Sequence, residues 1–159
     1  MAKKHVFVSF DYTNDKLYKF LLNAWDANKN MDFVFNDFSS DEIQTNSVSV
    51  VKTNLTKKIN AATYTLVIVG AESTKQHPDH ELIGFNNWQS FEVQRSADAG
   101  NKIVVVKIDS SYDAPIECYG IGAQWVNGFT QDGIINALNN AQWNTLIFFT
   151  IITKTPLYL

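Results

Sequence analysis

A carboxylate and an aromatic ring within one helical turn form the arrangement in this chain that most clearly suggests chemistry. In the stretch Trp88-Gln89-Ser90-Phe91-Glu92 the two outer residues stand four apart, so a helix would place their side chains on one face. A carboxylate beside an aromatic wall could hold ribose hydroxyls and stabilise a developing oxocarbenium ion. The structural alternative is that Glu92 is a surface carboxylate favoured by the dipole of a first helical turn, with Trp88 and Phe91 packing against a sheet.

Other reactive side chains have simpler explanations. His77 and His80 stand near Asp79 and Glu81, and such a set could be assembled into a metal site. Two histidines beside a proline are more often solvated loop residues, so we expect no metal. Cys118 is the single cysteine, which excludes an intrachain disulfide and fits a reducing compartment. Nothing around it indicates the lowered pKa that a nucleophilic thiol needs.

The loop after the first strand-like run lacks the features of several nucleotide-binding families. Residues 9–15 contain no glycine, which argues against a P-loop or a Rossmann dinucleotide fingerprint. A flavodoxin would need a first loop rich in small residues for the flavin phosphate, and this loop matches poorly. A phosphoacceptor receiver domain requires an aspartate at the end of the third strand, where Val69 and Gly70 stand instead.

The composition is that of a globular domain that does not bind nucleic acid. The 159 residues are 45% hydrophobic and 18% charged, with a net charge of −3 at pH 7, enough to bury a core in one domain. The lysines are scattered and Arg95 is the single arginine, so backbone phosphates have no basic stripe to bind. No run approaches the ~20 apolar residues of a membrane span, and no secretory signal is evident. We expect a soluble, cytoplasmic protein.

Strand-like and helical segments alternate along the chain. Strands are expected at 5–10, 31–35, 64–70, 103–108 and 120–126, and helices at 16–25, 45–62, 88–99 and 131–140. In the first helix the apolar residues Leu17, Phe20, Leu21, Ala24 and Trp25 follow helical spacing and are expected to face the core. Gly100 suits the left-handed position after a helix end.

This alternation predicts an α/β fold of three layers. Continuous apolar strands separated by helices favour a mostly parallel five-stranded sheet with helices on both faces. Right-handed crossovers make the flavodoxin-like order 2-1-3-4-5 the leading choice. Ligands bind beyond the carboxyl ends of such strands, so the loops after Phe10, Phe35 and Gly70 should surround one crevice, beside the start of the Trp88 helix.

The end of the chain does not fit this pattern. We divide the sequence into a domain at 1–142 and an apolar tail at 143–159. Within the tail, residues 145–153 are uncharged and strongly β-prone. The tail is expected to form an extra strand or an oligomer interface, because an exposed segment of this kind would promote aggregation.

Two parts of the sequence, in this order and spacing, resemble TIR domains. Residues 6–10, a polar loop with Asp15 and a helix are similar to the opening box of that family. Residues 88–92, followed by a helix and by 100–106, resemble its tryptophan-to-glutamate stretch leading into the fourth strand. The long loop before Trp88 and the strand end at 68–70 are most similar to TIR-like proteins of bacterial Thoeris anti-phage defence. The resemblance spans about residues 4 to 141.

The resemblance implies a flavodoxin-like fold and a reaction. Enzymatic TIR domains cleave the N-glycosidic bond of NAD and release nicotinamide, and Thoeris members cyclise the ADP-ribose into a signalling nucleotide that activates a separate effector. NAD is then a substrate, and no cofactor is implied. The catalytic glutamate of the family matches Glu92. The residues implied to line the nucleotide site are Phe10, Asp11, Tyr12, Ser73 and Trp88.

Two other functions remain open from the sequence. Animal adaptor TIR domains show that the fold can serve as an interaction module without chemistry, for which Glu92 would be dispensable. A nucleoside-processing transferase of similar fold would share the glutamate chemistry but accept free nucleosides. TIR enzymes often complete their site by assembly, so a homo-oligomer is a further expectation. Residues 36–42 lack the proline usual in animal TIR domains, and no signalling-interface role is transferred to them.

Overall fold

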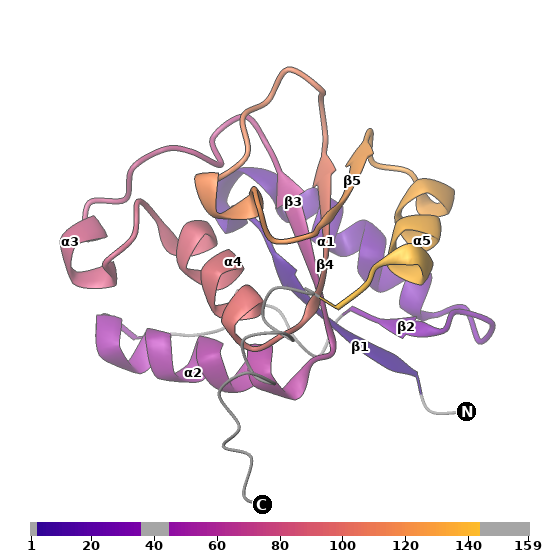
Figure 1. Cartoon of the computed structure of the whole chain (residues 1–159), viewed down its shortest axis with the longest axis horizontal. Helices are drawn as coiled ribbons and strands as arrows, with labels where there is room; N and C mark the ends of the chain where they lie inside the picture. Colours follow the sequence, from indigo (N-terminus) through magenta and orange to yellow (C-terminus); the bar gives the residue numbers. More distant parts are fainter. Residues whose placement is uncertain (1–2, 36–44, 144–159) are drawn as a thin grey trace, which may run out of the picture.

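A parallel five-stranded sheet lies at the centre of the fold (Figure 1), in a computed structural model that describes residues 3–35 and 45–143. The strand order is β2-β1-β3-β4-β5, and every pair is parallel. The strands are β1 (Lys4–Ser9), β2 (Phe33–Val34), β3 (Tyr64–Val69), β4 (Lys102–Lys107) and β5 (Gln124–Asn127). The flavodoxin-like order predicted from the sequence is therefore confirmed.

Helices cover both faces of the sheet and make the outer two layers. They are α1 (Tyr12–Asp26), α2 (Val48–Ala61), α3 (His80–Ile83), α4 (Trp88–Asp98) and α5 (Gln131–Asn140), with a 3₁₀ turn at Ile116–Cys118. One core cluster joins Leu22 of α1 and Ile134 of α5 to the sheet. The other face carries α2 and α4, which lie side by side in Figure 1. None of the helices in the described residues has the length and apolar character to span a membrane.

Side-chain caps determine where the long helices begin. Asp11 accepts a hydrogen bond from the Thr13 amide at the start of α1, and Asn87 accepts one from the Ser90 amide at the start of α4. Such caps satisfy amides that have no partner within the helix. After α4 the chain turns at Gly100 with φ +77°, the left-handed conformation expected there.

Several boundaries differ from the sequence prediction. The β2 strand has only two residues, because Phe33 and Val34 alone pair with β1. The α1 helix begins at Tyr12, four positions before the expected start, because Asp11 caps it. The long loop after β3 contains the short helix α3, which the pattern did not indicate. The expectation for the tail at 143–159 concerns almost entirely residues 144–159, which lie outside the described residues.

The prediction of which face of α1 packs against the core is largely wrong. Leu17, Phe20 and Leu21 are 62%, 61% and 41% exposed, although Trp25 does pack against the core. The buried face of the helix instead carries Asp15, Lys19 and Leu22. Helical spacing allows either stripe to face inward, and the contacts of Leu22 with the sheet decide between them. An exposed apolar stripe is left on the outer side of α1.

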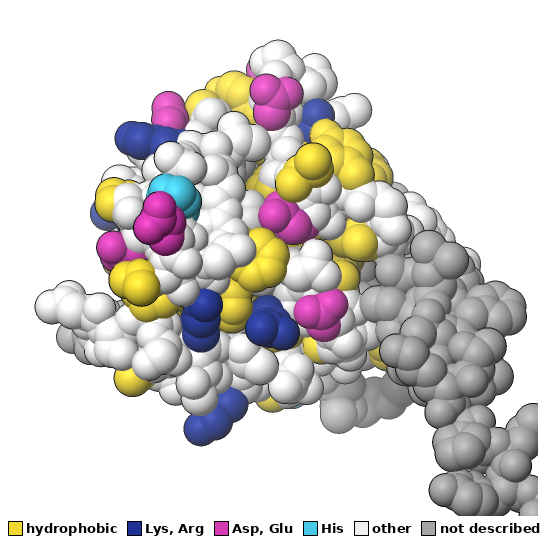
Figure 2. All heavy atoms as spheres, turned by 60° about the vertical axis from the view of Figure 1, so that its left-hand side comes forward, with side chains coloured by type: hydrophobic (Ala, Val, Ile, Leu, Met, Phe, Trp, Pro, Cys, Tyr) yellow, Lys and Arg dark blue, Asp and Glu magenta, His cyan; other side chains and the backbone are white. Residues whose placement is uncertain are grey.

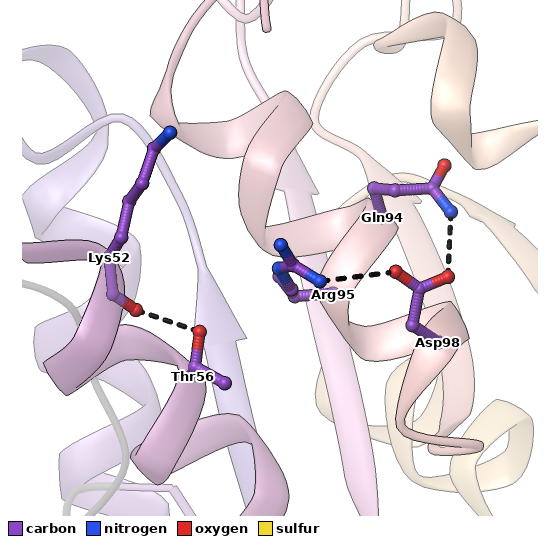
Figure 3. A network of polar contacts seen from close by, with 5 residues as sticks. All are labelled: Lys52, Thr56, Gln94, Arg95 and Asp98. Atoms are coloured by element: carbon purple, nitrogen blue, oxygen red, sulfur yellow. Dashed lines mark hydrogen bonds and ion pairs between the residues drawn. The ribbon is translucent and has the colours of Figure 1, made fainter. Parts of the chain in front are cut away.

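Phe91 fixes the rotation of α4 against α2. Its ring is 1% exposed and packs with Leu55 of α2. The Lys52 ammonium and the Arg95 guanidinium lie 5.8 and 5.4 Å from the ring centroid, within the range of cation–π attraction. Figure 3 shows these two cations on facing helices, with Arg95 paired to Asp98 at 3.6 Å. With Phe91 directed at α2, the neighbouring Glu92 is turned toward the sheet.

Candidate active site

Glu92 is a buried carboxylate at the carboxyl end of the sheet. It is 1% exposed, and the Ser9 Oγ donates a hydrogen bond of 3.0 Å to its Oε1. Ser9 is the last residue of β1, whereas Glu92 lies in the second turn of α4. The alternative of a surface carboxylate in a first helical turn is therefore wrong. A buried charge near a strand end is costly unless function or partners compensate it, which makes this a candidate site.

Gln89 joins the ends of two strands to the first turn of α4. Its Nε2 donates to the backbone oxygens of Ser9, at 3.2 Å, and of Ile68, at 2.7 Å. Sequence reasoning did not single out Ser9 or Gln89. The available signals were the place of Ser9 at the end of a strand and the spacing of Gln89, three residues before Glu92 on the same helix face.

The loop after β3 is fastened to the start of α4. The Gly70 amide donates to the Ser73 Oγ at 2.9 Å. The Asn87 Nδ2 donates to the backbone oxygens of Ser73, at 2.8 Å, and of Lys75, at 3.0 Å, while its Oδ1 caps the helix at the Ser90 amide. These bonds hold the loop at a set position beside the helix that carries Glu92.

A cavity of about 470 Å³ lies between these loops and the start of α4. This volume is in the range of small-molecule sites. Its lining contains every site residue named from the sequence, namely Phe10, Asp11, Tyr12, Ser73, Trp88 and Glu92, together with Gln89, Lys75, His77 and Glu72. Residues from the loop after β1, the loop after β3 and α4 thus meet around one crevice, as parallel strands require. The loop after Phe35, also expected there, falls mostly on residues 36–44, outside the described residues. The roles of these residues remain a prediction.

Aromatic rings flank the cavity. Trp88 packs edge-on against Phe91, with centroids 5.7 Å apart, and against His77 at 6.4 Å. Elsewhere in the cavity lining, the rings of Phe10 and Tyr12 pack edge-to-face, with centroids 6.2 Å apart. Tyr12 is 52% exposed, whereas Phe10 is buried. Flat apolar surfaces next to a carboxylate suit a planar cationic ring, which gains both stacking and charge attraction.

Asp15 is a second buried carboxylate beside this edge of the sheet. It is 7% exposed, and its burial, together with the nearby charge of Asp11, raises its pKa to about 6. A Cβ added at Gly70 would overlap the Asp15 carboxylate. The glycine at the end of β3 is thus required by a close approach from α1. This contact places the first loop against the third.

Neither of the other candidate centres gains support from the structure. Within residues 3–35 and 45–143, no three His, Cys, Asp or Glu side chains lie close enough to hold a metal ion. The His77 Nδ1 accepts a hydrogen bond from the Asp79 amide at 3.0 Å. Cys118 is buried, and burial beside Glu117 raises its pKa to about 12, so the thiol stays protonated at neutral pH.

The charged side chains of the described residues form no continuous basic patch on the face drawn in Figure 2. Lysine and arginine side chains there stand apart or in small groups, and acidic and apolar side chains lie between them. In the described part of the cavity lining, the carboxylates of Asp11, Glu72 and Glu92 outnumber the one lysine, Lys75. This balance favours a ligand with a cationic or neutral group at the cavity over a polyanion.

Comparison with known proteins gives one family and one fold. The family model described as Thoeris protein ThsB, TIR-like domain, matches residues 7–113. No curated protein matches the chain. A solved 2-deoxyribosyltransferase from Bacillus psychrosaccharolyticus is similar, with a TM-score of 0.52 and 14% identity over 83% of this chain and 90% of that one. At this identity the likeness shows a shared fold alone.

Proposed function

The chain belongs to the ThsB TIR-like family of Thoeris defence proteins, and from this premise we propose that it cleaves NAD, releases nicotinamide and cyclises the ADP-ribose into a signalling nucleotide. The product would activate a separate effector in anti-phage defence. The observation that supports the chemistry most directly is the buried Glu92 carboxylate, held by Ser9, beside a cavity that aromatic residues flank.

The proposed reaction needs little from the protein besides positioning and charge. The bond between the ribose C1′ and the nicotinamide nitrogen breaks, and its electron pair neutralises the pyridinium. Nicotinamide therefore leaves as a neutral molecule, and no general acid is required. The Glu92 carboxylate orients the ribose hydroxyls and stabilises the cation that develops at C1′. Trp88, Phe10 and Tyr12 supply apolar surface for the rings of the substrate.

The outcome of the reaction depends on water. If an internal nucleophile of the ADP-ribose attacks C1′, the product is cyclic; if water attacks, it is linear ADP-ribose. Cyclisation requires the cavity to exclude water while the cation exists. Because only 1% of Glu92 is exposed, the adjoining loops must open for the ribose to reach it. Assembly into an oligomer, which the family resemblance implies, is one way to stabilise such an opening.

The direct test is incubation of the purified protein with NAD, followed by chromatography for nicotinamide and ADP-ribose species. Nicotinamide with a cyclic product, absent in the Glu92→Gln variant, is the expected result. Linear ADP-ribose alone would reduce the proposal to an NAD hydrolase. The assay is repeated with a crowding agent and with lysate of phage-infected cells, because an unassembled protein could be silent. Absence of turnover under all of these conditions would contradict the proposal.

The exposed stripe on α1 supports a second candidate, a module that assembles with partners and has no chemistry. Leu17 and Phe20 are both more than half exposed, and Leu21 lies beside them on the same helical face. Such a stripe on a surface helix is typical of an interaction site. Under this alternative Phe20→Asp abolishes association in light scattering, and Glu92→Gln leaves defence against phage intact. The enzyme proposal expects Glu92→Gln to abolish defence.

The shared fold with a 2-deoxyribosyltransferase motivates one further arm of the assay. Fold alone does not carry an activity. Free nucleosides, incubated beside NAD under the same conditions, separate the two chemistries. Base release from a nucleoside with no release of nicotinamide from NAD would favour the transferase.

A further inference from the structure

Gln89 presents a buried acceptor that no described residue of the protein uses. The side chain is 5% exposed and lines the cavity. Both hydrogens of its Nε2 are directed at backbone oxygens, those of Ser9 and Ile68. Its Oε1 has no hydrogen-bond partner among the described residues. A buried acceptor without a partner is unfavourable, and in a native protein it calls for an explanation such as a ligand.

The orientation of this amide is determined by its neighbours. Exchanging the nitrogen and oxygen of Gln89 would set Oε1 against the Ser9 and Ile68 carbonyl oxygens, two acceptors facing a third. The nitrogen must therefore face the strand ends, and the oxygen is left for another donor. Because both strand ends are fixed in the sheet, the Gln89 amide is held rigidly.

The acceptor stands next to the reacting position of the proposed reaction. Gln89 precedes Glu92 by three residues, so both side chains leave the same face of α4. The side chains of Gln89 and Glu92 are both almost fully buried. The same opening of the loops that brings the ribose to Glu92 therefore brings the adjoining group of the substrate to Gln89. In the nicotinamide half of NAD the donors are two ribose hydroxyls and the carboxamide N–H. The proposed reaction assigns the two ribose hydroxyls to Glu92, so the carboxamide N–H is the donor that remains for the Gln89 Oε1.

We propose that the Gln89 Oε1 accepts a hydrogen bond from the carboxamide of the nicotinamide ring and so makes the site selective for the amide over the acid form of the dinucleotide. This inference rests on the proposed function. In the nicotinic acid form of the dinucleotide, a carboxylate replaces the carboxamide. It would face the Gln89 Oε1 and the Glu92 carboxylate, and it has no hydrogen to donate to either. Repulsion between acceptors then adds to the lost hydrogen bond.

The test measures binding of three dinucleotides by calorimetry in a Glu92→Gln background, which prevents their consumption. NAD is compared with its 3-acetylpyridine analogue, which lacks the N–H donor, and with its nicotinic acid analogue. With Gln89 present, NAD should bind about fivefold more tightly than the acetylpyridine analogue, as expected for one hydrogen bond. In Gln89→Met, which has neither donor nor acceptor amide, this ratio should fall to about one.

Two further variants keep the inference testable if Gln89→Met does not fold stably. Gln89→Lys supplies N–H donors to the two backbone oxygens but no acceptor, and it should reverse the preference toward the nicotinic acid analogue. Gln94→Met is the matched control, because Gln94 lies on the same helix but donates to the Asp98 carboxylate at 3.0 Å and does not line the cavity. Its NAD-to-analogue ratio should equal that of the parent.

Each outcome separates this inference from the proposed function. Equal binding of NAD and the acetylpyridine analogue in the presence of Gln89 overturns the inference and leaves NAD cleavage standing. An equal loss for both ligands in Gln89→Met overturns the carboxamide assignment, because the donor would then be a group that both ligands share. Failure of NAD to bind to the Glu92→Gln protein, together with no turnover of NAD by the parent protein, overturns both.

Discussion

Ser9 and Glu92, 83 residues apart in the chain, share a buried hydrogen bond of 3.0 Å from the hydroxyl to the carboxylate. The bond joins the last residue of β1 to the second turn of α4. It fixes one oxygen of the carboxylate and so determines the direction in which the remaining lone pairs of Glu92 face. Ser9 is therefore a positioning residue for the proposed reaction.

Replacement of Ser9 by alanine tests this role. Without the hydroxyl, Glu92 loses a fixed orientation in its buried position, and we expect kcat for NAD cleavage to fall about tenfold with KM nearly unchanged. The free energy of unfolding should fall by about 1 kcal/mol, the net value of one hydrogen bond. Steady-state kinetics and urea denaturation measure the two effects. A change in KM alone would show that Ser9 acts on binding and does not position the carboxylate.

The Asp15 carboxylate should make stability depend on pH. Burial raises its pKa from 3.8 to about 6, so the fold disfavours its ionised form. The stability associated with the protonated form is complete below about pH 4 and is lost as pH rises through about 6. Asp15→Asn removes this loss and should stabilise the protein by about 1–2 kcal/mol at pH 8, with a much smaller difference at pH 4. Denaturation at both pH values checks this, and an equal difference at the two would contradict it.

Glycine at position 70 is required by the approach of α1. In Gly70→Ala the added Cβ overlaps the Asp15 carboxylate, and we expect a loss of about 1–3 kcal/mol in the free energy of unfolding. The double variant Gly70→Ala/Asp15→Ala should recover much of this loss, because the side chain that causes the overlap is gone. Thermal denaturation of the four proteins completes the cycle. Additive losses would show that the two residues do not contact one another.

The rotation of α1 is tested by two apolar residues on opposite faces. Phe20 is 61% exposed and Leu22 is fully buried. Phe20→Ala should change the free energy of unfolding by less than about 0.5 kcal/mol. Leu22→Ala should cost about 2–5 kcal/mol, because it leaves a cavity in the core. Chemical denaturation of each variant gives both values. A larger loss of stability for Phe20→Ala than for Leu22→Ala would contradict the observed rotation of α1, because it would mean that the Phe20 face packs against the sheet.

Much of the fold could be predicted because it depends on local patterns. The apolar runs at 5–10, 64–70 and 103–108 are long enough for buried strands, and the helices between them allow only right-handed parallel crossovers. The strand order and the meeting of the first and third loops at one edge follow from this. The six residues assigned to the site line one cavity for the same reason.

Long-range contacts decided the rest, because they depend on which groups meet after the chain has folded. The sequence by itself determined that Glu92 lies on a helix beside Trp88, but not that the carboxylate is buried against Ser9. Gln89 gained its two backbone partners only when the ends of β1 and β3 came together under α4. Likewise two stripes on α1 had helical spacing, and only packing of Leu22 on the sheet left the more apolar one outside. The spacing of residues in the sequence determines which of them share a face of the helix, and tertiary contacts determine which face is buried.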